Sequence, residues 1–518
     1  MEQAGLFARK KGVMNISRLD WVSVFFAISA SVMGIFALYG GGEYGQSLAV
    51  KKMLWLTLGL ILMLFLSQVN YQILGSYSTI IYGAALLLLI FTLVPFIGAK
   101  IKGARSWIRF FGIGFQPTEF AKIAFVIFLS KYLVLKETEI DKLKELILPF
   151  LITAAPVLLI ALQPDLGSAI IFLPILFIML FIGGANVSVI IGLLLIGFSV
   201  LFIPMFLEYH KYILVSDIVS YLKKVDYKLA DAVRILNFEV WHYVENPSLV
   251  SEIKSTSAVG WSAKTIIQPE NLALFGQAVE EVKKNNPSFF RDFFSNNITI
   301  LIIIGSTAII YGACYFLNYL SRTKWLKSIS TISLIIFLSL SSTLIFRQAM
   351  SFKPHQVIRI VSFANPDKFP KGAGYQLRHS LITIGSGQIW GKGLLQGDMT
   401  RGDTPYLPEW YNDFVFSVIG EQFGFWGAAL TILLLFGLVL RGVTIALQSK
   451  DDYGALLAGG LTSIFFFHII INIGIAMGLF PVTGIPLVFI SYGGSNMVAS
   501  FAALGIILNI SLRRFINV

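Results

Sequence analysis

Cysteine, histidine and charged residues are all scarce in this chain of 518 residues. The single cysteine, Cys314, excludes a disulfide framework and a cysteine-based metal site. Five scattered histidines argue against a zinc site. Charged residues make up 13% of the chain, whereas soluble domains have about 25%. Together these absences exclude an ordinary soluble protein.

The chain is instead 56% hydrophobic, with a mean hydropathy of +0.77. Apolar runs close to the roughly 20 residues that a helix needs to cross a bilayer recur along it. We predict twelve membrane spans, at 21–40, 53–69, 79–98, 119–135, 146–162, 168–182, 187–207, 298–320, 329–346, 414–440, 455–477 and 495–512. The fold class expected is an all-α polytopic integral membrane protein.

Basic residues gather in the short loops and give the chain a net charge of +12. The preference of basic residues for the cytoplasmic side of a membrane explains this excess without a nucleic-acid partner. Lys10, Lys11 and Arg18 precede the first span, and Arg513 and Arg514 follow the last. With an even number of spans, we expect both termini to be cytoplasmic and the first span to be retained.

Two long segments interrupt the spans and divide the chain into five parts. These are spans one to seven in 1–207, an insertion at 208–297, spans eight and nine in 298–346, a loop at 347–413 and spans ten to twelve in 414–518. Amphipathic stretches at 213–238 and 272–284 predict that the insertion is mostly helical and extracytoplasmic. The loop at 347–413 is basic and rich in Gly and Pro, so we expect it to line a cavity at the outer surface.

Two carboxylates, Glu409 and Asp413, lie at the mouth of the apolar segment that starts at Phe414. An acid at a membrane interface is costly, and its default interpretation is a functional site. Asp is also a favoured N-cap, and spacing alone favours that structural role for Asp413. Glu409 is either an interfacial loop acid or a group that places an acceptor or a divalent cation.

Five segments of the chain resemble motifs of the SEDS family (shape, elongation, division and sporulation), and within it the RodA branch. They are GARSWI at 103–108 with QPTEFAK at 116–122, QPDLGS at 163–168, GYQ at 374–376 with GSGQIWGKGL at 385–394, LPEWYNDFVF at 407–416 with GE at 420–421, and GLFPVTGIP at 478–486 with SYGGS at 491–495. The resemblance implies a SEDS-type helical bundle of about ten core spans. The chain would then carry an extra pair of spans around the insertion.

The chain also departs from the family pattern. Tyr411 and Asn412 stand where the family usually has His-Thr, so a role of that histidine does not transfer. Ser106 replaces an Arg of the first motif, and Gln422 replaces the second Glu of a Gly-Glu-Glu sequence. Asp413 and Glu409 both match the family motif.

The resemblance implies a peptidoglycan glycosyltransferase that polymerises lipid II on the outer face of the bacterial cytoplasmic membrane, for cell elongation and rod shape. Asp413 would be the catalytic base that takes a proton from the acceptor 4-hydroxyl group. The acceptor would attack the anomeric carbon with inversion as polyprenyl diphosphate leaves. A class B penicillin-binding transpeptidase is the implied partner, because the glycan must be crosslinked.

Charged and aromatic residues of the outer loops are candidates for holding the substrate. The predicted substrate-binding residues are Arg105, Trp107, Glu119, Lys122, Asp165, Lys392, Arg401 and Glu409. The basic ones could neutralise a diphosphate by charge-assisted hydrogen bonds. A divalent cation, Mg or Mn, is an option, but no motif requires a metal or another cofactor.

Structural alternatives remain open for several of these residues. Lys122 lies one turn from Glu119, so the two could form a structural pair. Asp165 could serve turn and cap chemistry, and Trp107 could be an interfacial anchor. Glu421 is expected to be a buried partner of an Arg or Lys.

Two other functions compete with polymerisation. One is a transporter that moves the lipid-linked precursor across the bilayer, but no internal repeat is visible and the acids cluster on one face. The other is a scaffold that activates a penicillin-binding synthase. A scaffold would leave Asp413 dispensable, whereas an enzyme would make it essential.

Overall fold

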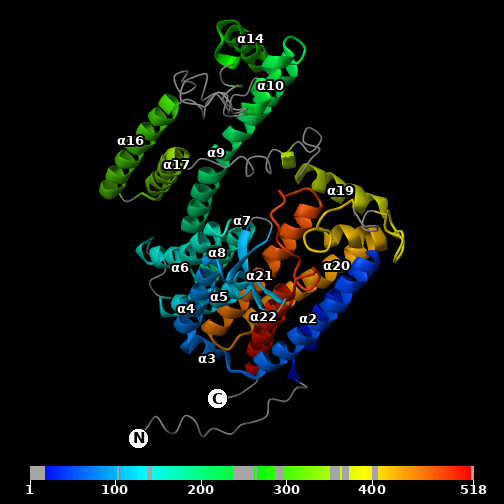
Figure 1. Cartoon of the computed structure of the whole chain (residues 1–518). Coiled ribbons are helices and arrows are strands. Elements are labelled where there is room, and N and C mark those ends of the chain that lie inside the picture. The colour runs from blue at the N-terminus through cyan, green and yellow to red at the C-terminus, as the bar shows by residue number, and fades with distance from the viewer. Residues whose placement is uncertain are drawn as a thin grey trace. The chain divides into compact units, whose positions relative to one another are not determined.

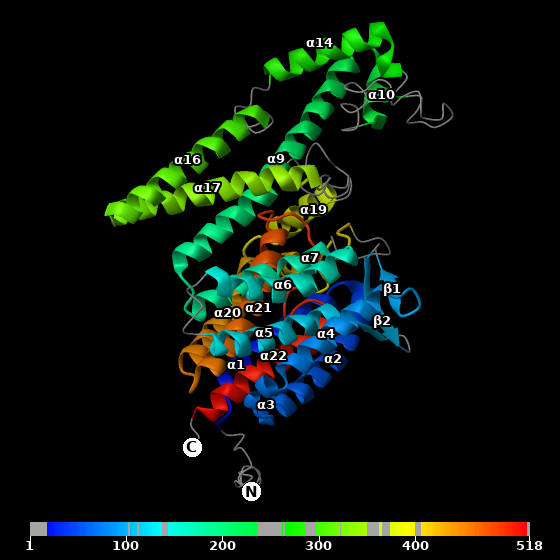
Figure 2. The same cartoon turned by 90° about the vertical axis from the view of Figure 1, so that its left-hand side faces the viewer.

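The computed structural model describes residues 18–101, 104–110, 113–136, 143–236, 262, 265–285, 297–321, 323–349, 362–364, 373–398 and 406–514. These residues divide into two compact units, one within 1–190 and 370–518 and the other within 191–369. Figure 1 shows the chain with its element labels, and Figure 2 shows it from a second direction.

The first unit is a helical bundle. Its helices are α1 (Trp21–Tyr39), α2 (Gly42–Gln68), α3 (Tyr71–Ser76), α4 (Ser78–Leu93), α5 (Pro117–Leu135), α6 (Leu143–Leu162), α7 (Leu166–Ile170), α8 (Phe172–Ile182), α19 (Ala373–Ser386), α20 (Val415–Leu447), α21 (Asp452–Ala476) and α22 (Gly494–Arg513). The helix α22 is buried almost all round and packs against α2, α5 and α21. A helix buried on every side belongs in the middle of a bundle.

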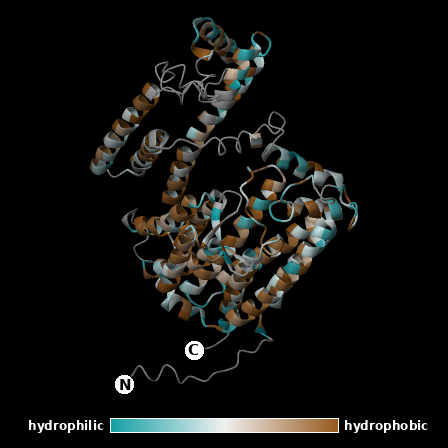
Figure 3. Cartoon of the chain, viewed as in Figure 1, coloured by the Kyte–Doolittle hydropathy of each residue, from teal (hydrophilic) through white to brown (hydrophobic). Residues whose placement is uncertain are grey.

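Apolar residues make up most of these helices, as the brown colour of their ribbons in Figure 3 shows. Phe25 on α1 and Leu433 and Leu440 on α20 are all exposed. An outward apolar surface is expected of helices that face lipid. The first unit is therefore a multi-pass membrane bundle.

Each of the twelve predicted spans coincides with a helix in the described part of the chain. Among the described residues, nine helices are long and apolar enough to cross a membrane. Ser78–Leu93 and Gly167–Ile182 are shorter apolar helices. The helix α5 carries three charged residues, Glu119, Lys122 and Lys131, within its 19 residues.

A small antiparallel sheet, which the sequence analysis did not predict, lies between α4 and α5. Its strands are β1 (Gly98–Ile101), β2 (Ala104–Phe110) and β3 (Ile113–Phe115), in the order β1-β2-β3. Trp107 of β2 pairs with Ala99 of β1, and Ile108 pairs with Phe115 of β3. The three strands connect the end of α4 to the start of α5, and residues 104–108 of the first motif lie on β2.

The second unit contains α9 (Val187–Leu222), α10 (Tyr227–Leu236), α14 (Pro269–Asn285), α16 (Asn297–Ser321) and α17 (Lys324–Ala349). The end of α9 packs with α10 and α14 around its own apolar core, which includes Ile218, Val233 and Phe275. The amphipathic stretch at 272–284 is thus helical, and the one at 213–238 is helical in α9 and α10 with a turn at 223–226 between them. The helices α16 and α17 pack against each other.

Candidate active site

The segment that carries Glu409 and Asp413 is a series of turns leading into α20. Glu409 adopts a positive φ of 58°, and its carbonyl accepts hydrogen bonds from the amides of Asn412 at 3.0 Å and Asp413 at 3.2 Å. The buried ring of Trp410 packs against Gly41, at the turn between α1 and α2. The cap alternative for Asp413 is wrong, because α20 begins at Val415 and its cap position is Phe414.

Glu409 also affects the pKa of the nearby Tyr411 phenol. Burial raises the pKa of the Tyr411 phenol above its usual range, and the adjacent Glu409 carboxylate and Tyr44 raise it further. The phenol therefore stays protonated at neutral pH and can donate a hydrogen bond. Tyr411 occupies the place where the family usually has His, so this chain has a neutral donor at that position.

Two other parts of the bundle hold the backbone around Asp413. Asn472 of α21 donates to the Asp413 carbonyl at 3.1 Å and to the Ile485 carbonyl at 2.7 Å. The Ser491 hydroxyl donates to the Asn412 carbonyl at 2.6 Å, and the Tyr492 amide donates to the Tyr411 carbonyl at 2.9 Å. The fourth and fifth motifs are thereby bonded to each other.

The carboxylate of Asp413 lies next to the fifth motif, and the second motif packs there as well. Asp413 Oδ2 is 3.9 Å from the position that a Cβ on Gly484 would take. A Cβ on Gly167 would clash with the carbonyl oxygen of Thr483. Only glycine permits this approach, so 163–168 contacts 483–484 beside Asp413.

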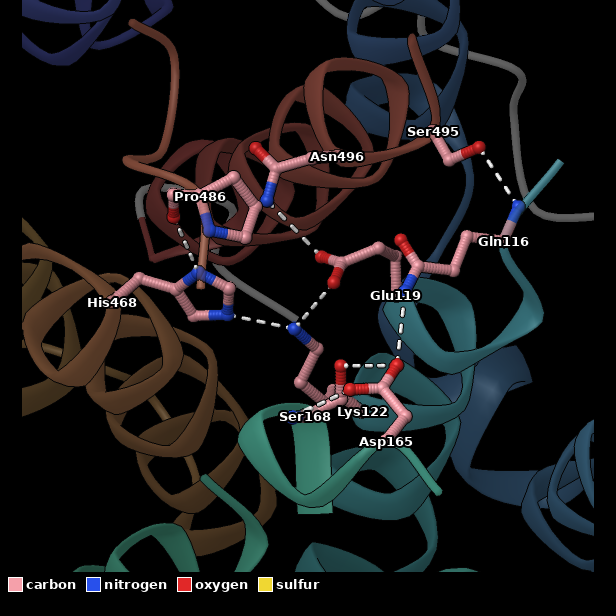
Figure 4. Close-up of polar contacts among 9 residues, drawn as sticks. All are labelled: Gln116, Glu119, Lys122, Asp165, Ser168, His468, Pro486, Ser495 and Asn496. Atoms are coloured by element: carbon pink, nitrogen blue, oxygen red, sulfur yellow. Dashed lines mark hydrogen bonds and ion pairs between the residues drawn. The ribbon is translucent and has the colours of Figure 1, made fainter. Parts of the chain in front are cut away.

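Asp165 connects the second motif to the first. Its carboxylate accepts hydrogen bonds from Gln116 Nε2 at 3.3 Å, Ser168 N at 3.3 Å and Ser168 Oγ at 3.0 Å (Figure 4). The main-chain N–H of Gln116 donates a hydrogen bond to Ser495 Oγ at 2.9 Å. Asp165 is the N-cap of α7, so the turn-and-cap alternative describes its contacts.

Glu119 and Lys122 form a buried ion pair in the interior of the bundle, also drawn in Figure 4. Lys122 Nζ lies 2.8 Å from Glu119 Oε1 and 2.6 Å from His468 Nε2 of α21. Asn496 of α22 donates to Glu119 Oε2 at 3.2 Å, and His468 Nδ1 lies 3.0 Å from the Pro486 carbonyl. The side chains of Lys122 and Glu119 are only 1% and 5% exposed. The structural pairing of the two residues is confirmed.

Lys392 forms a second ion pair, with Glu421 and Asp398. Its Nζ lies 2.9 Å from the buried Glu421 Oε1 and 3.0 Å from Asp398 Oδ2. Burial acts to lower the pKa of Lys392, but hydrogen bonds to both carboxylates prevail and raise that pKa. Glu421 is therefore the buried partner of a lysine, as expected. The two acids occupy two of the three Nζ donors of Lys392, and the exposed Asp398 is the easier of the two to displace.

Arg105 and Trp107 lie on β2, in the small sheet. The Arg105 amide donates to the Gln163 carbonyl at 3.1 Å, which joins the sheet to the second motif. Within the described residues, the half-exposed Arg105 guanidinium makes no ion pair or hydrogen bond. The Trp107 ring packs over Gly114 of β3. Arg401, the remaining candidate, lies outside the described residues.

The structure thus links Asp413, Asp165 and the Glu119–Lys122 pair through the 483–496 segment, whereas Lys392 is bonded to Glu421 of α20. Sequence reasoning missed Trp410, Asn472, His468 and Asn496. A signal existed for two of them, because His468 and Asn472 are four residues apart on one face of an otherwise apolar helix. No group of three or more His, Cys, Asp or Glu that could hold a metal is found among the described residues.

The family model for FtsW, RodA and SpoVE, described as cell cycle protein, matches residues 13–237 and 273–515. The chain belongs to this family, the SEDS family. The matched SEDS residues include α9 and α16, the helices on either side of the insertion, and leave out 238–272.

SEDS relatives of both branches align over nearly the whole chain. The peptidoglycan glycosyltransferase RodA of Treponema pallidum is 29% identical over 97% of this chain and 99% of its own length. A probable peptidoglycan glycosyltransferase FtsW of Trichlorobacter lovleyi is 23% identical over 96% of this chain and 94% of its own length. Relatives that carry the name RodA and relatives that carry the name FtsW thus both align with this chain, and both are named peptidoglycan glycosyltransferases, the FtsW relative as a probable one.

Solved SEDS structures share the fold. A chain of a peptidoglycan synthase complex that coordinates polymerization and crosslinking superposes with a TM-score of 0.55 and 22% identity, covering 96% of this chain and 99% of that chain. The rod shape determining protein RodA of Thermus thermophilus gives a TM-score of 0.51 and 20% identity, over 96% and 98% of the two chains. At these identities the likeness establishes the polytopic fold alone.

Proposed function

We propose that this protein is a peptidoglycan glycosyltransferase that polymerises lipid II into glycan strands, and that it serves cell elongation and rod shape. One observation carries the proposal. The Asp413 carboxylate stands where the second, fourth and fifth motifs of the family meet, beside Gly484 and the Gly167–Thr483 contact. The elongation role rests on the RodA-like form of the 385–394 motif.

Asp413 is the general base in this proposal. A base must lie within hydrogen-bond reach of the hydroxyl it deprotonates, and its own position must be fixed. Asn472 holds the Asp413 carbonyl, Glu409 holds the Asp413 amide, and Ser491 holds the preceding residue. These restraints fix the backbone that carries the Asp413 carboxylate.

Arg105 is the first candidate for the diphosphate leaving group. Its guanidinium has no partner within the described residues, and an arginine can bind phosphate oxygens through two parallel hydrogen bonds. Lys122 is buried in its pair with Glu119 and acts on the site through His468 and Pro486. Lys392 is held by two acids, so it ranks behind Arg105.

The proposal includes a location and a partner. Basic residues before α1 and after α22 support cytoplasmic termini, which place Asp413 on the outer side of the bacterial cytoplasmic membrane. The synthase complex with the same fold couples polymerization to crosslinking. We therefore expect a class B penicillin-binding transpeptidase to bind this chain and crosslink its product.

The test compares polymerisation of labelled lipid II by the purified wild type and Asp413→Asn, with and without the partner transpeptidase. Asp452→Asn is the matched control, because it removes an exposed acid at the start of α21. We expect polymer from the wild type and the control and none from Asp413→Asn. Equal polymer from all three would refute the base assignment. No polymer from any of them, even with partner, would favour transport or scaffolding.

A further inference from the structure

Lys52 is a fully buried lysine that none of the motifs contains. It lies on α2, is 1% exposed, and donates hydrogen bonds from Nζ to the carbonyls of Ile490 and Ser491. Its neighbour Lys51 is exposed. The long Lys52 side chain therefore joins α2 to the fifth motif, 438 residues further along the chain.

The surroundings of Lys52 offer little compensation for burying a lysine. Within the described part of the chain, no carboxylate pairs with its Nζ, and the two backbone carbonyls are its partners. An ionisable group placed inside a membrane bundle without a counter-ion is costly, and such residues mark functional positions. An apolar side chain of the same length would pack there at lower cost if packing were its only task.

The turn that Lys52 binds is strained. Phe489 adopts a φ of +62°, a region that residues with a Cβ rarely occupy. Its ring is clamped between Phe465 and Phe501, with centroids 5.3 Å and 5.1 Å away. The Leu487 carbonyl accepts from the Ser491 amide at 2.9 Å, and the Leu487 amide donates to Ser491 Oγ at 2.8 Å. Strain of this kind persists only where the surroundings hold it in place.

The strained turn leads directly to the candidate base. Ser491, whose carbonyl Lys52 binds, donates its hydroxyl proton to the Asn412 carbonyl. The next residue, Tyr492, donates its amide to the Tyr411 carbonyl. Asp413 follows Asn412, so a movement of the turn would move the backbone that carries the carboxylate.

We propose that Lys52 is a positioning residue for the glycosyl transfer. It holds the 487–491 turn and, through Ser491 and Tyr492, sets the position of Asp413. The inference rests on the proposed function of Asp413. Lys52 does not touch substrate itself, because its side chain is enclosed and its Nζ points at backbone carbonyls.

The test uses Lys52→Met and, because that variant could fail to fold, Lys52→Gln, which keeps a hydrogen-bond donor. Lys51→Met is the matched control, since it removes the same charge from the exposed neighbour. Hydrogen exchange is measured by mass spectrometry on peptides covering 406–416 and 486–495. Polymerisation of lipid II is measured as separate kcat and KM values.

In Lys52→Met we expect faster hydrogen exchange in both peptides and an unchanged KM. We expect kcat to fall by roughly 10- to 100-fold, because a displacement of about 1 Å can slow a reaction by that factor. Lys52→Gln should lie between Lys52→Met and the wild type, and Lys51→Met should match the wild type. Ser491→Ala should lower kcat too, and its combination with Lys52→Met should not lower it further, because both act through one chain of contacts.

Two results would overturn the proposal. One is unchanged exchange at 406–416 in Lys52→Met and Lys52→Gln, and the other is faster exchange with normal kcat. A wild type that makes no polymer would sink the proposed function separately, and the exchange measurement alone would then decide whether Lys52 holds the segment that carries Asp413.

Discussion

Removing one member of the Glu119–Lys122 pair should destabilise the bundle more than removing both. Lys122→Met would leave the Glu119 carboxylate buried with the Asn496 amide as its remaining described partner. Breaking a buried pair from one side costs about 3–5 kcal/mol, whereas replacing both members by neutral residues is often close to neutral. We therefore expect a loss of about 3–5 kcal/mol for Lys122→Met and recovery of most of it in Glu119→Gln/Lys122→Met.

The assay is the free energy of unfolding in mild detergent, measured for the wild type, both single variants and the double variant. Independent residues have additive effects, so a double variant that loses the sum of the single losses would refute the buried-pair reasoning. Polymerisation of lipid II by the double variant then separates structure from function. We expect polymerisation by the double variant to stay low, because the variant lacks the Lys122–His468 contact that leads on to the Pro486 carbonyl. Full activity in the stable double variant would make the pair structural alone.

Three further predictions concern the packing of the motifs and the Lys392 ion pair. Gly167→Ala should lower both stability, by about 1–3 kcal/mol, and polymerisation, because the new methyl group clashes with the Thr483 carbonyl. Gly83→Ala is its control and should be neutral or stabilising when the free energy of unfolding is measured in the same way, because its Cβ meets open space within a helix. Glu421→Leu should speed proteolysis of the 387–398 segment, since Lys392 loses a charged hydrogen bond that contributes about 1.5–3 kcal/mol. The hydrogen-bonded carboxylates raise the pKa of Lys392. The wild-type 387–398 segment should therefore resist proteolysis from neutral pH up to about pH 10 and become susceptible only above that. Resistance already lost near neutral pH would contradict this prediction.

The helices were predictable because long apolar runs have few alternatives in a membrane protein. Every predicted span coincides with a helix, from α1 to α22. The sheet at 98–115 was missed because its strands are short, at four, seven and three residues, and interrupted by glycines. Strands of that length carry almost no periodic signal.

Contacts between residues that are far apart in the sequence could not be predicted from the sequence. The Lys122 pairing with Glu119 was foreseeable from its spacing, but His468 and Asn496 lie 346 and 377 residues away from their partners. The cap interpretation of Asp413 failed because α20 begins one residue later than Phe414. That shift leaves Asp413 in a turn, where its backbone is held by Asn472 rather than by a helix.

The three-stranded sheet sets a depth scale for the site. Open strand edges do not occur in the lipid-exposed hydrocarbon of a bilayer, because their backbone groups would lack partners. Each open edge of the sheet therefore lies either at the headgroup level or against protein. β3 ends at Phe115, immediately before α5. At a rise of about 1.5 Å per residue, Glu119 lies about 3 Å and Lys122 about 8 Å beyond Pro117, the first residue of α5, along the helix axis. Glu119 and Lys122 thus lie about one and two turns into α5, on the far side of Gln116 from the sheet.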